Sequence, residues 1–260
     1  IKLFTAAIEK PFGMILVTGP TGSGKTTSLY SALSHLNSIE KNIITLEDPV
    51  EYEFPIIRQS QINEKINFTF SAGLRTILRQ DPDVILVGEM RDKETIDMSI
   101  RAALTGHLVF STLHTNSSVA SITRLVDMGV EPFLISSSVI MIIAQRLVRK
   151  ICEYCKTTIH DEAIPDHTST EMLISKDTFY KGTGCDRCNN SGYKGRIGVF
   201  EILTISNAIK DLIERRATTQ EIIDQAKKEG FKTLFEDALD KVQAGLISLE
   251  EAIKITVGSL

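Results

Sequence analysis

Short apolar runs alternate with longer stretches of helical character through the first half of the chain. Four runs are short and nearly continuous in apolar side chains: residues 14–18, 43–46, 84–88 and 108–112. Such runs are typical of strands buried on both faces of a parallel sheet. Helical patterns separate and follow them, at residues 26–36, 72–78, 93–104, 118–127 and 133–147. The alternation predicts an α/β fold with a mostly parallel sheet covered by helices on both faces.

The longest apolar stretch, residues 133–144, is too short for a membrane span. It holds about twelve residues, three of them serines, whereas a membrane-spanning helix needs about 20 apolar residues. We therefore expect a buried helix here.

The character of the chain changes after residue 147. Residues 151–194 contain four cysteines and several glycines with little periodicity, and residues 197–203 have the pattern of a strand. The remainder is charged and helical, with Gly230 and Gly245 as expected helix stops. We predict three parts: a core at 1–147, a tetracysteine subdomain at 148–199 and a helical subdomain at 200–260.

Composition narrows the class of protein. With 260 residues and 42% hydrophobic side chains, the chain can form one large domain, or a medium one with appendages. Its 29 basic and 33 acidic residues give a formal charge of −4, so no overall basic field would attract nucleic acid or anionic lipid. No secretory signal opens the sequence, and we expect a cytosolic protein with reduced or metal-bound cysteines.

A glycine-rich segment follows the first predicted strand. It fits G-x-x-x-x-G-K-[ST] and comprises Gly19, Pro20, Thr21, Gly22, Ser23, Gly24, Lys25, Thr26 and Thr27. In such a phosphate loop, backbone N–H groups and the start of the next helix bind a triphosphate. Lys25 would reach the β- and γ-phosphates, and the Thr26 hydroxyl would bind Mg²⁺. We therefore predict a nucleoside triphosphate site rather than a ligand-free turn.

Two acidic residues follow predicted strands, Glu47 after 43–46 and Glu89 after 84–88. Ligands bind at the carboxyl ends of strands in open α/β sheets, and we expect both strands to flank that of the phosphate loop. Hydrolysis needs one carboxylate to orient and deprotonate water, and another to hold Mg²⁺ through its water shell. Either acid alone would more simply be a solvated loop residue, but together they are candidates for these two roles.

Two histidines bracket the fourth predicted strand. His114 follows residues 108–112, where it could sense the γ-phosphate of a bound nucleotide. His107 precedes the same strand and therefore lies at the opposite end, where it is structural or bridges to a neighbouring segment.

Arg75 and Arg79 are four residues apart, so we expect them to share one helix face. They could supply positive charge to a transferred phosphoryl group across a subunit boundary. The alternative is a pair of surface arginines bound to Asp81 or Asp83, and the residues alone do not decide between the two.

The four cysteines fall into two C-x-x-C pairs, and no cysteine lies outside them. Two such pairs can close a tetrahedral structural Zn²⁺ site, with Cys152, Cys155, Cys185 and Cys188 as ligands. The gap of 29 residues between the pairs exceeds that of a zinc finger, so we expect an insertion. His160 and His167 lie in this insertion and are not needed as ligands. The alternative is four independent thiols.

Two segments, residues 74–92 and 105–116, resemble the secretion ATPases of type II secretion and type IV pilus assembly. The similarity continues through residues 192–201 and 245–252 and covers essentially the whole chain. It implies a RecA-like ATPase that works as a homo-hexameric ring on the cytoplasmic face of the inner membrane. There it would use ATP to drive pilin or pseudopilin subunits out of the bilayer through a polytopic platform protein.

The resemblance also implies roles for single residues. Glu47 would be the general base of the Asp box, and Glu89, in an atypical Walker B motif, would hold the Mg²⁺-bound water. Residues 107–114 resemble the His box of the family. Arginines that the family needs for activity at domain or subunit boundaries match Arg75, Arg79, Arg91 and Arg196.

Two further features bear on the resemblance: the cysteine array indicates a branch of the family, and the start of the chain indicates how much of a family member it contains. The tetracysteine array is usual in assembly and secretion ATPases and generally missing from retraction ATPases, which favours an assembly or secretion motor. Family members carry a further N-terminal domain, and this chain begins near the linker that follows it. We therefore expect a fragment, with a site that arginines of that domain would complete.

Three alternatives remain at this stage. A RecA-like nucleic-acid translocase would need a basic groove with stacking aromatics, but aromatic residues make up 6% of the chain and tryptophan is absent. A DNA-uptake pseudopilus ATPase belongs to the same motor class and is not separable from it. A zinc-knuckle scaffold that binds nucleotide without hydrolysis would leave Glu47 and Glu89 without a role.

Overall fold

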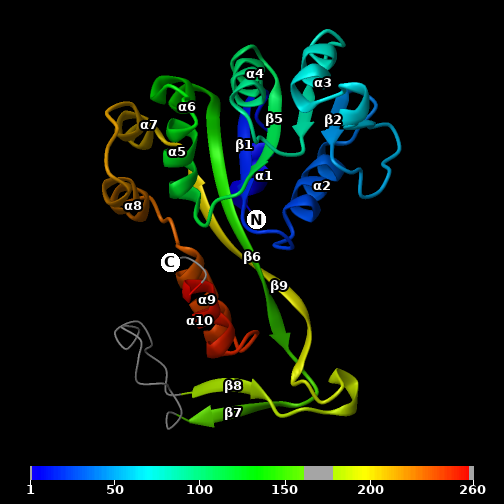
Figure 1. Ribbon diagram of the computed structural model, residues 1–260. Helices are drawn as coiled ribbons and strands as arrows, with labels where there is room; N and C mark the ends of the chain where they lie inside the picture. The colour runs from blue at the N-terminus through cyan, green and yellow to red at the C-terminus, as the bar shows by residue number, and fades with distance from the viewer. Residues whose placement is uncertain (1, 161–177, 258–260) are drawn as a thin grey trace. The chain divides into compact units, whose positions relative to one another are not determined.

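The computed structural model describes residues 2–160 and 178–257 (Figure 1). The strands are β1 (Gly13–Thr18), β2 (Ile43–Glu47), β3 (Arg58–Gln61), β4 (Val84–Val87), β5 (Leu108–Leu113), β6 (Val139–Ile151), β7 (Lys156–His160), β8 (Thr178–Gly182) and β9 (Tyr193–Thr204). The α-helices are α1 (Lys2–Ile8), α2 (Lys25–Leu36), α3 (Phe70–Ile77), α4 (Lys93–Leu104), α5 (Ser118–Asp127), α6 (Pro132–Ser138), α7 (Asn207–Glu214), α8 (Thr219–Lys228), α9 (Leu234–Gln243) and α10 (Leu249–Val257). Two 3₁₀-helices, η1 (Glu64–Ile66) and η2 (Asp186–Cys188), complete the described elements.

Seven strands form one sheet in the order β3-β2-β4-β5-β1-β6-β9. All the neighbouring pairs from β3 to β6 are parallel. The predicted α/β fold with a mostly parallel sheet is therefore confirmed, and β1, β2, β4 and β5 coincide with the four predicted strands. The sequence did not predict β3, whose residues are polar and only partly buried at the edge of the sheet.

The strand order corrects one expectation about the site. The strands next to β1 are β5 and β6, whereas β4 is its second neighbour and β2 its third. The strands that end at Glu47 and before Glu89 therefore do not flank that of the phosphate loop. At about 4.8 Å per strand, β4 lies about 10 Å and β2 about 14 Å from β1.

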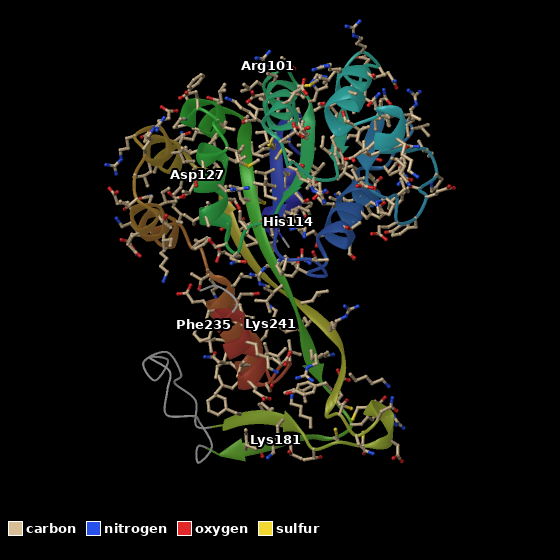
Figure 2. All side chains as sticks on the ribbon, in the orientation of Figure 1. Arg101, His114, Asp127, Lys181, Phe235 and Lys241 are labelled. Atoms are coloured by element: carbon tan, nitrogen blue, oxygen red, sulfur yellow. The ribbon has the colours of Figure 1, made fainter. Side chains whose placement is uncertain are left out.

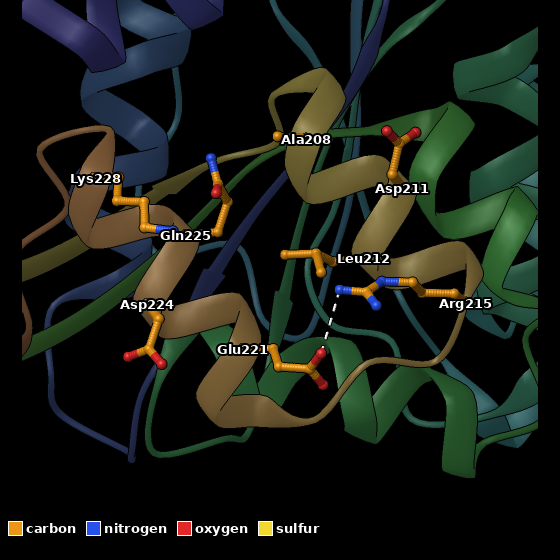
Figure 3. Close-up of a pocket in the computed structure, with 8 residues that line it drawn as sticks. All are labelled: Ala208, Asp211, Leu212, Arg215, Glu221, Asp224, Gln225 and Lys228. Carbon is orange, nitrogen blue, oxygen red and sulfur yellow. Dashed lines mark hydrogen bonds and ion pairs between the residues drawn. The ribbon is translucent and has the colours of Figure 1, made fainter.

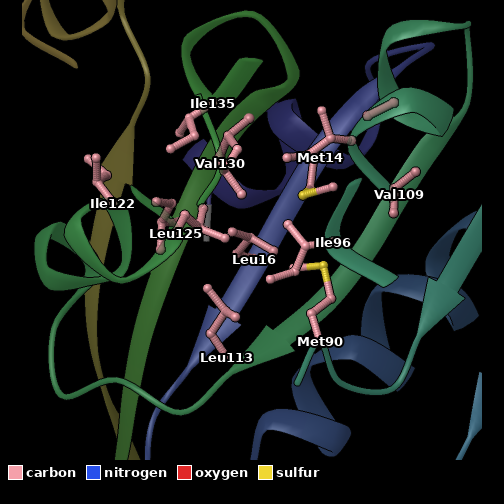
Figure 4. Packing of buried hydrophobic residues seen from close by; sticks show 14 of the residues in the cluster. Met14, Leu16, Met90, Ile96, Val109, Leu113, Ile122, Leu125, Val130 and Ile135 are labelled. Atoms are coloured by element: carbon pink, nitrogen blue, oxygen red, sulfur yellow. The ribbon is translucent and has the colours of Figure 1, made fainter. Parts of the chain in front are cut away.

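The core explains why the central strands are continuously apolar. Every residue of β1, β2, β4 and β5 is buried. Met14 and Leu16 join Ile96 of α4 and Leu125 of α5 in one cluster (Figure 4). The helix α2 also packs against β1, but its buried leucines lie outside that cluster. Alternate residues of a strand point to opposite faces of the sheet. The cluster with α4 and α5 lies on one face and α2 on the other, so helices cover both faces.

The predicted helix over residues 133–147 is wrong beyond Ser138. The chain is helical only in α6 and continues as β6, which pairs with β1 from Val139 onward. The hydroxyls of Ser136 and Ser138 bond back to helix carbonyls, which weakens the helix end. The apolar run that follows is rich in β-branched residues and is buried on the sheet, and periodicity alone does not distinguish such a strand from a buried helix.

The cysteine-rich region contains regular structure that the sequence did not reveal. Strands β7 and β8 pair as an antiparallel ribbon, and of the second cysteine pair Cys185 caps η2 and Cys188 lies in it. His167 lies outside the described residues. In the C-terminal part, Gly230 and Gly245 adopt positive φ angles of 87° and 65° just after α8 and α9. Both glycines therefore end helices, as predicted.

The chain divides into two compact units, and each combines two stretches of sequence. The first unit contains residues 1–144 and 202–231, and the second contains residues 145–201 and 232–260. The division into parts at 1–147, 148–199 and 200–260 stays a prediction. Among the described helices, none combines the length and apolar character that crossing a bilayer requires.

A buried carboxylate stabilises the second unit. Glu251 of α10 is 5% exposed and accepts hydrogen bonds from the backbone N–H, Nε and Nη2 of Arg149 at 2.9, 3.1 and 2.8 Å. Lys254 Nζ donates to the same carboxylate at 2.9 Å. Burial by itself would raise the pKa of Glu251, but the bonds from Arg149 and Lys254 outweigh it and lower the pKa to about 2.

This pair makes the stability of the second unit depend on pH. Since the folded pKa of Glu251 is depressed from 4.5 to about 2, its stabilisation is present above pH 4.5 and is lost as pH falls toward 2. When the pH is lowered from 5.5 to 2.5, we expect the free energy of unfolding to fall less in Glu251→Gln than in wild type. The difference between the two losses should be on the order of 2 kcal/mol. Urea unfolding of both proteins at the two pH values measures this difference. Equal losses in the two proteins would contradict the role of Glu251.

Candidate functional site

The phosphate loop joins the end of β1 to the start of α2. Gly19, Gly22 and Gly24 have φ angles of 145°, 77° and 90°, conformations that residues with a Cβ rarely adopt. Gly24 is the N-cap of α2 and provides no side-chain cap. The first N–H groups of the helix therefore face the loop without a capping side chain, as an anion site requires.

Lys25 and Ser23 both turn toward the inside of the loop. The Lys25 ammonium donates to the carbonyl oxygens of Gly19 at 2.9 Å and Pro20 at 3.1 Å, so the side chain folds over the loop. Ser23 is 3% exposed, and its Oγ has no hydrogen-bond partner among the described residues. A buried hydroxyl without a partner is costly in a folded protein. Ser23 thus fits a polar ligand in the loop, and the exposed side chain of Thr26 lies at the start of the same helix.

Hydrogen bonds of Thr18 link the phosphate loop to the end of β5. The Thr18 hydroxyl lies 3.0 Å from the carbonyl oxygen of Leu113 and 2.9 Å from that of Thr115. It also accepts a hydrogen bond from the Thr115 N–H at 2.9 Å. Only the fold reveals this connection, although the threonine at the end of an otherwise apolar strand is a signal of it in the sequence. The link places the residue after Leu113, which is His114, beside the start of the loop.

Glu89 and His114 meet at this edge of the sheet. His114 Nε2 lies 3.3 Å from Glu89 Oε2, and Arg91 Nη2 lies 2.5 Å from Glu89 Oε1. The Glu89 side chain is 12% exposed, whereas those of His114 and Arg91 are 52% and 70% exposed. Figure 2 labels His114 just past the end of β5. The structure thus brings together two of the predicted site residues, and the bond from Thr112 to the carbonyl of Gly88 supports them.

Glu47 occupies a separate, buried site at the end of β2. It is 3% exposed, and its carboxylate accepts hydrogen bonds from Tyr30, from Thr45 at 2.6 Å and from Gln59 at 3.1 Å. Tyr30 lies on α2, five residues after Lys25, which is an axial rise of about 7.5 Å. The helix that begins at the phosphate loop therefore also contacts Glu47. The sequence did not reveal Tyr30 and Gln59, because neither belongs to a local motif.

The environment of Tyr30 keeps its hydroxyl protonated. Burial, first, and the bond to the Glu47 carboxylate, second, together raise its pKa to about 12. Tyr30 therefore acts as a hydrogen-bond donor to Glu47 at neutral pH.

The arginines differ from the expected arrangement. Arg75 lies on α3 and pairs with Glu94 of α4 rather than with Asp81 or Asp83. Arg79 lies beyond the end of α3 at Ile77, so the two arginines do not share a face of this helix. Arg79 is exposed and forms no ion pair within the described part of the chain.

His107 forms structural contacts with the helix that precedes it, and a bridge to a neighbouring segment stays a prediction. Its Nδ1 lies 2.9 Å from the carbonyl oxygen of Ala102 and 3.3 Å from the hydroxyl of Thr105. It thus ties the end of α4 to the start of β5, away from His114.

The four cysteine sulfurs form one compact cluster in the second unit. The Sγ atoms of Cys152, Cys155, Cys185 and Cys188 all lie within 4.8 Å of one another. The separations of 152–185, 155–188 and 185–188 are 3.9, 3.8 and 3.7 Å. A disulfide would require about 2.05 Å. Four sulfurs at 2.3 Å from a tetrahedral ion would be about 3.8 Å apart, so the cluster has the dimensions of a zinc site.

Backbone N–H groups also favour a thiolate in this cluster. The N–H groups of Cys185 and Gly192 both donate to Cys188 Sγ at 3.3 Å. Burial would raise the pKa of Cys188, but these bonds and those from neighbouring thiols lower it to about 6. A thiolate is the form that binds metal.

A surface groove lies elsewhere in the first unit. It has a volume of about 430 Å³ and lies between α7 and α8 (Figure 3). Its lining residues are Ala208, Asp211, Leu212, Arg215, Glu221, Asp224, Gln225 and Lys228. It contains none of the predicted site residues, and two of its lining residues, Arg215 and Glu221, form an ion pair at 3.2 Å.

Comparison with known proteins agrees with the geometry. The sequence profile of the family described as "Type II/IV secretion system protein" matches residues 1–254. The chain is 48% identical over 257 residues to "Type II secretion system ATPase E" of Vibrio cholerae, covering 97% of this chain and 50% of the relative. It is 46% identical over 253 residues to "Type IV pilus assembly ATPase PilB" of Myxococcus xanthus, covering 96% and 45%.

Two solved structures have a similar fold. The pilus retraction motor PilT with bound ADP superposes with a TM-score of 0.75 at 33% identity, covering 98% of this chain and 64% of that one. The Legionella pneumophila ATPase DotB gives a TM-score of 0.71 at 25% identity, covering 99% and 63%. The chain spans about half the length of the curated relatives that it matches. It belongs to the family of type II/IV secretion system proteins.

Proposed function

We propose that this chain is the ATP-hydrolysing part of a motor that powers type II secretion or the assembly of a pilus or pseudopilus. The observation that carries the proposal is the phosphate loop, in which Lys25 folds inward and the buried Ser23 hydroxyl has no hydrogen-bond partner in the described part of the chain. The names of the relatives, a secretion ATPase and a pilus assembly ATPase, support the same function.

The loop residues would bind the nucleotide. Gly19, Pro20, Thr21, Gly22, Ser23, Gly24, Lys25, Thr26 and Thr27 would surround the phosphates, with Lys25 leaving the loop carbonyls for the β- and γ-phosphates. Thr26 and, through water, Glu89 fit Mg²⁺, since both offer oxygen atoms at this edge of the sheet. Bound there, Mg²⁺ would neutralise charge on the phosphates.

The remaining predicted residues would act on the reaction. Glu47 would take a proton from the water that attacks the γ-phosphorus as the bond to ADP breaks. His114, paired with Glu89, would respond to the γ-phosphate. Arg75 and Arg79 would supply positive charge across a subunit boundary. The ion pair of Arg75 with Glu94 is half-exposed, so releasing Arg75 costs little.

The working form that we propose is a homo-hexamer. It would be cytoplasmic and peripheral to the inner membrane, acting on a polytopic platform protein, as the family resemblance implies. A subunit boundary would explain why Arg79 and Arg91 are exposed at the surface. The net charge of −4 gives no support to a nucleic-acid translocase.

Zinc in the tetracysteine cluster would be structural. Four sulfur ligands leave no open coordination position, so Cys152, Cys155, Cys185 and Cys188 would hold the ion without exposing it to substrate. Its binding would contribute to the folding of the surrounding residues.

Lys25→Ala should abolish function while the chain remains folded. Loss of the ammonium should reduce ATP turnover at least about a hundredfold, because it removes a charge that stabilises the transferred phosphoryl group. The matched control is Lys41→Ala, which changes an exposed lysine outside the loop. Phosphate release measures turnover. Turnover by Lys25→Ala at the wild-type rate would contradict the proposal. Wild-type turnover that requires added DNA would favour a translocase.

Purified protein should contain about one zinc per chain, measured by elemental analysis. Cys185→Ser should lower the zinc content and destabilise the second unit, because thiolate ligation contributes folding energy. Asp186→Asn, a change at the exposed neighbouring position, should retain the metal. Metal-free wild-type protein with four freely titrating thiols would show that the cluster is not a zinc site.

A further inference from the structure

Two of the three side chains that bond Glu47 also hold the backbone of the following segment, residues 48–56. The Tyr30 hydroxyl donates to Glu47 and accepts a hydrogen bond from the Glu51 N–H at 3.2 Å. Gln59 Nε2 donates to Glu47 at 3.1 Å and lies 3.2 Å from the carbonyl oxygen of Tyr52. The same two residues therefore contact the carboxylate and the segment.

Side chains of other elements hold segment 48–56 in place. The Phe54 N–H donates to Gln59 Oε1 at 2.7 Å, and the Val50 N–H donates to Gln61 Oε1 at 3.3 Å. The carbonyl oxygen of Pro55 accepts from Asn37 at 3.0 Å. Each of these bonds can break without disrupting the ladder of the sheet.

The segment also carries exposed apolar groups and backbone strain. The rings of Tyr52 and Phe54 pack against the ring of Tyr30, with centroids 4.6 and 5.0 Å away. Tyr52 and Ile56 are 55% and 61% exposed. Ile56 has a φ of 77°, which is unfavourable for a β-branched residue and persists only when surrounding contacts impose it.

We infer that Tyr30 and Gln59 are positioning residues that couple the conformation of segment 48–56 to the orientation of the Glu47 carboxylate. The inference deepens the proposed function, since it rests on Glu47 acting as the base. When the segment is in place, Tyr30 and Gln59 are fixed and Glu47 is held by both. When the segment is displaced, both residues lose partners and no longer fix the carboxylate. A contact at the surface of Tyr52 or Ile56 is thereby transmitted to a buried acid.

The coupling can be tested in both directions on this chain. Tyr30→Phe keeps the ring contacts and removes only the hydroxyl that joins Glu47 to Glu51. Tyr52→Phe is the matched control, because it removes a hydroxyl from the half-exposed ring that packs against Tyr30. Glu47→Gln tests whether a change at the carboxylate reaches segment 48–56. The Glu47 side chain bonds Tyr30 and Gln59 and not the segment itself, so any effect on the segment must pass through these two residues. Hydrogen exchange and steady-state ATP turnover are measured on all three variants and wild type.

In Tyr30→Phe and Glu47→Gln, we expect hydrogen exchange in residues 48–56 to accelerate about tenfold or more, as for the loss of a hydrogen bond to a charged group. Peptides from β1 and β5 should exchange as in wild type, which shows that the fold is retained. Tyr30→Phe should lower kcat about tenfold with KM unchanged, because Tyr30 lies away from the phosphate loop. Tyr52→Phe should match wild type in both measurements.

Two results would overturn the coupling. One is wild-type exchange of residues 48–56 in Glu47→Gln, and the other is a kcat of Tyr30→Phe equal to that of Tyr52→Phe in an enzyme that loses turnover in Glu47→Gln. Wild-type turnover in Glu47→Gln would instead count against the proposed role of Glu47 as the base. The exchange measurement would still test whether Glu47 and the segment are coupled.

Discussion

The arrangement of the site depends on the hydroxyl of Thr18. It stands at the end of β1, one residue before the phosphate loop, and bonds to the backbone of Leu113 and Thr115 at the end of β5. From β5, the hydroxyl of Thr112 bonds to the carbonyl of Gly88 at the end of β4. Three strand ends are thereby fixed relative to one another, so that Glu89 and His114 lie beside the loop.

The two carboxylates of the proposed mechanism sit in different environments. Glu89 pairs with the exposed groups of Arg91 and His114, whereas Glu47 is buried among the neutral donors Tyr30, Thr45 and Gln59. An acid beside an exposed arginine and an exposed histidine suits a role with charged ligands at the edge of the sheet. A buried acid with fixed orientation suits the handling of one proton, and its position depends on the segment that follows β2.

Local sequence predicted the features that depend on local chemistry. The phosphate loop, four central strands and the cysteine pairs each follow from residue types at fixed spacing. The strand order did not, because apolar runs such as β4 and β5 do not specify their neighbours, and so Glu47 was expected too close to β1. The serines of α6 did not reveal that Val139 begins a strand, since a buried strand and a buried helix have similar composition. Tyr30 and Gln59 reach Glu47 only in the folded chain.

The central claim is that ATP is hydrolysed at the phosphate loop with the help of Glu89, which lies beside it at the carboxyl ends of the strands. The most direct test is to measure ATP binding and phosphate release in the same samples of wild type, Glu89→Gln and the exposed control Glu64→Gln. The substitution keeps the shape of the side chain and removes the charge that would hold Mg²⁺. Glu89→Gln should bind ATP and lose at least about a hundredfold in turnover, while Glu64→Gln resembles wild type. Turnover by Glu89→Gln at the wild-type rate would contradict the account.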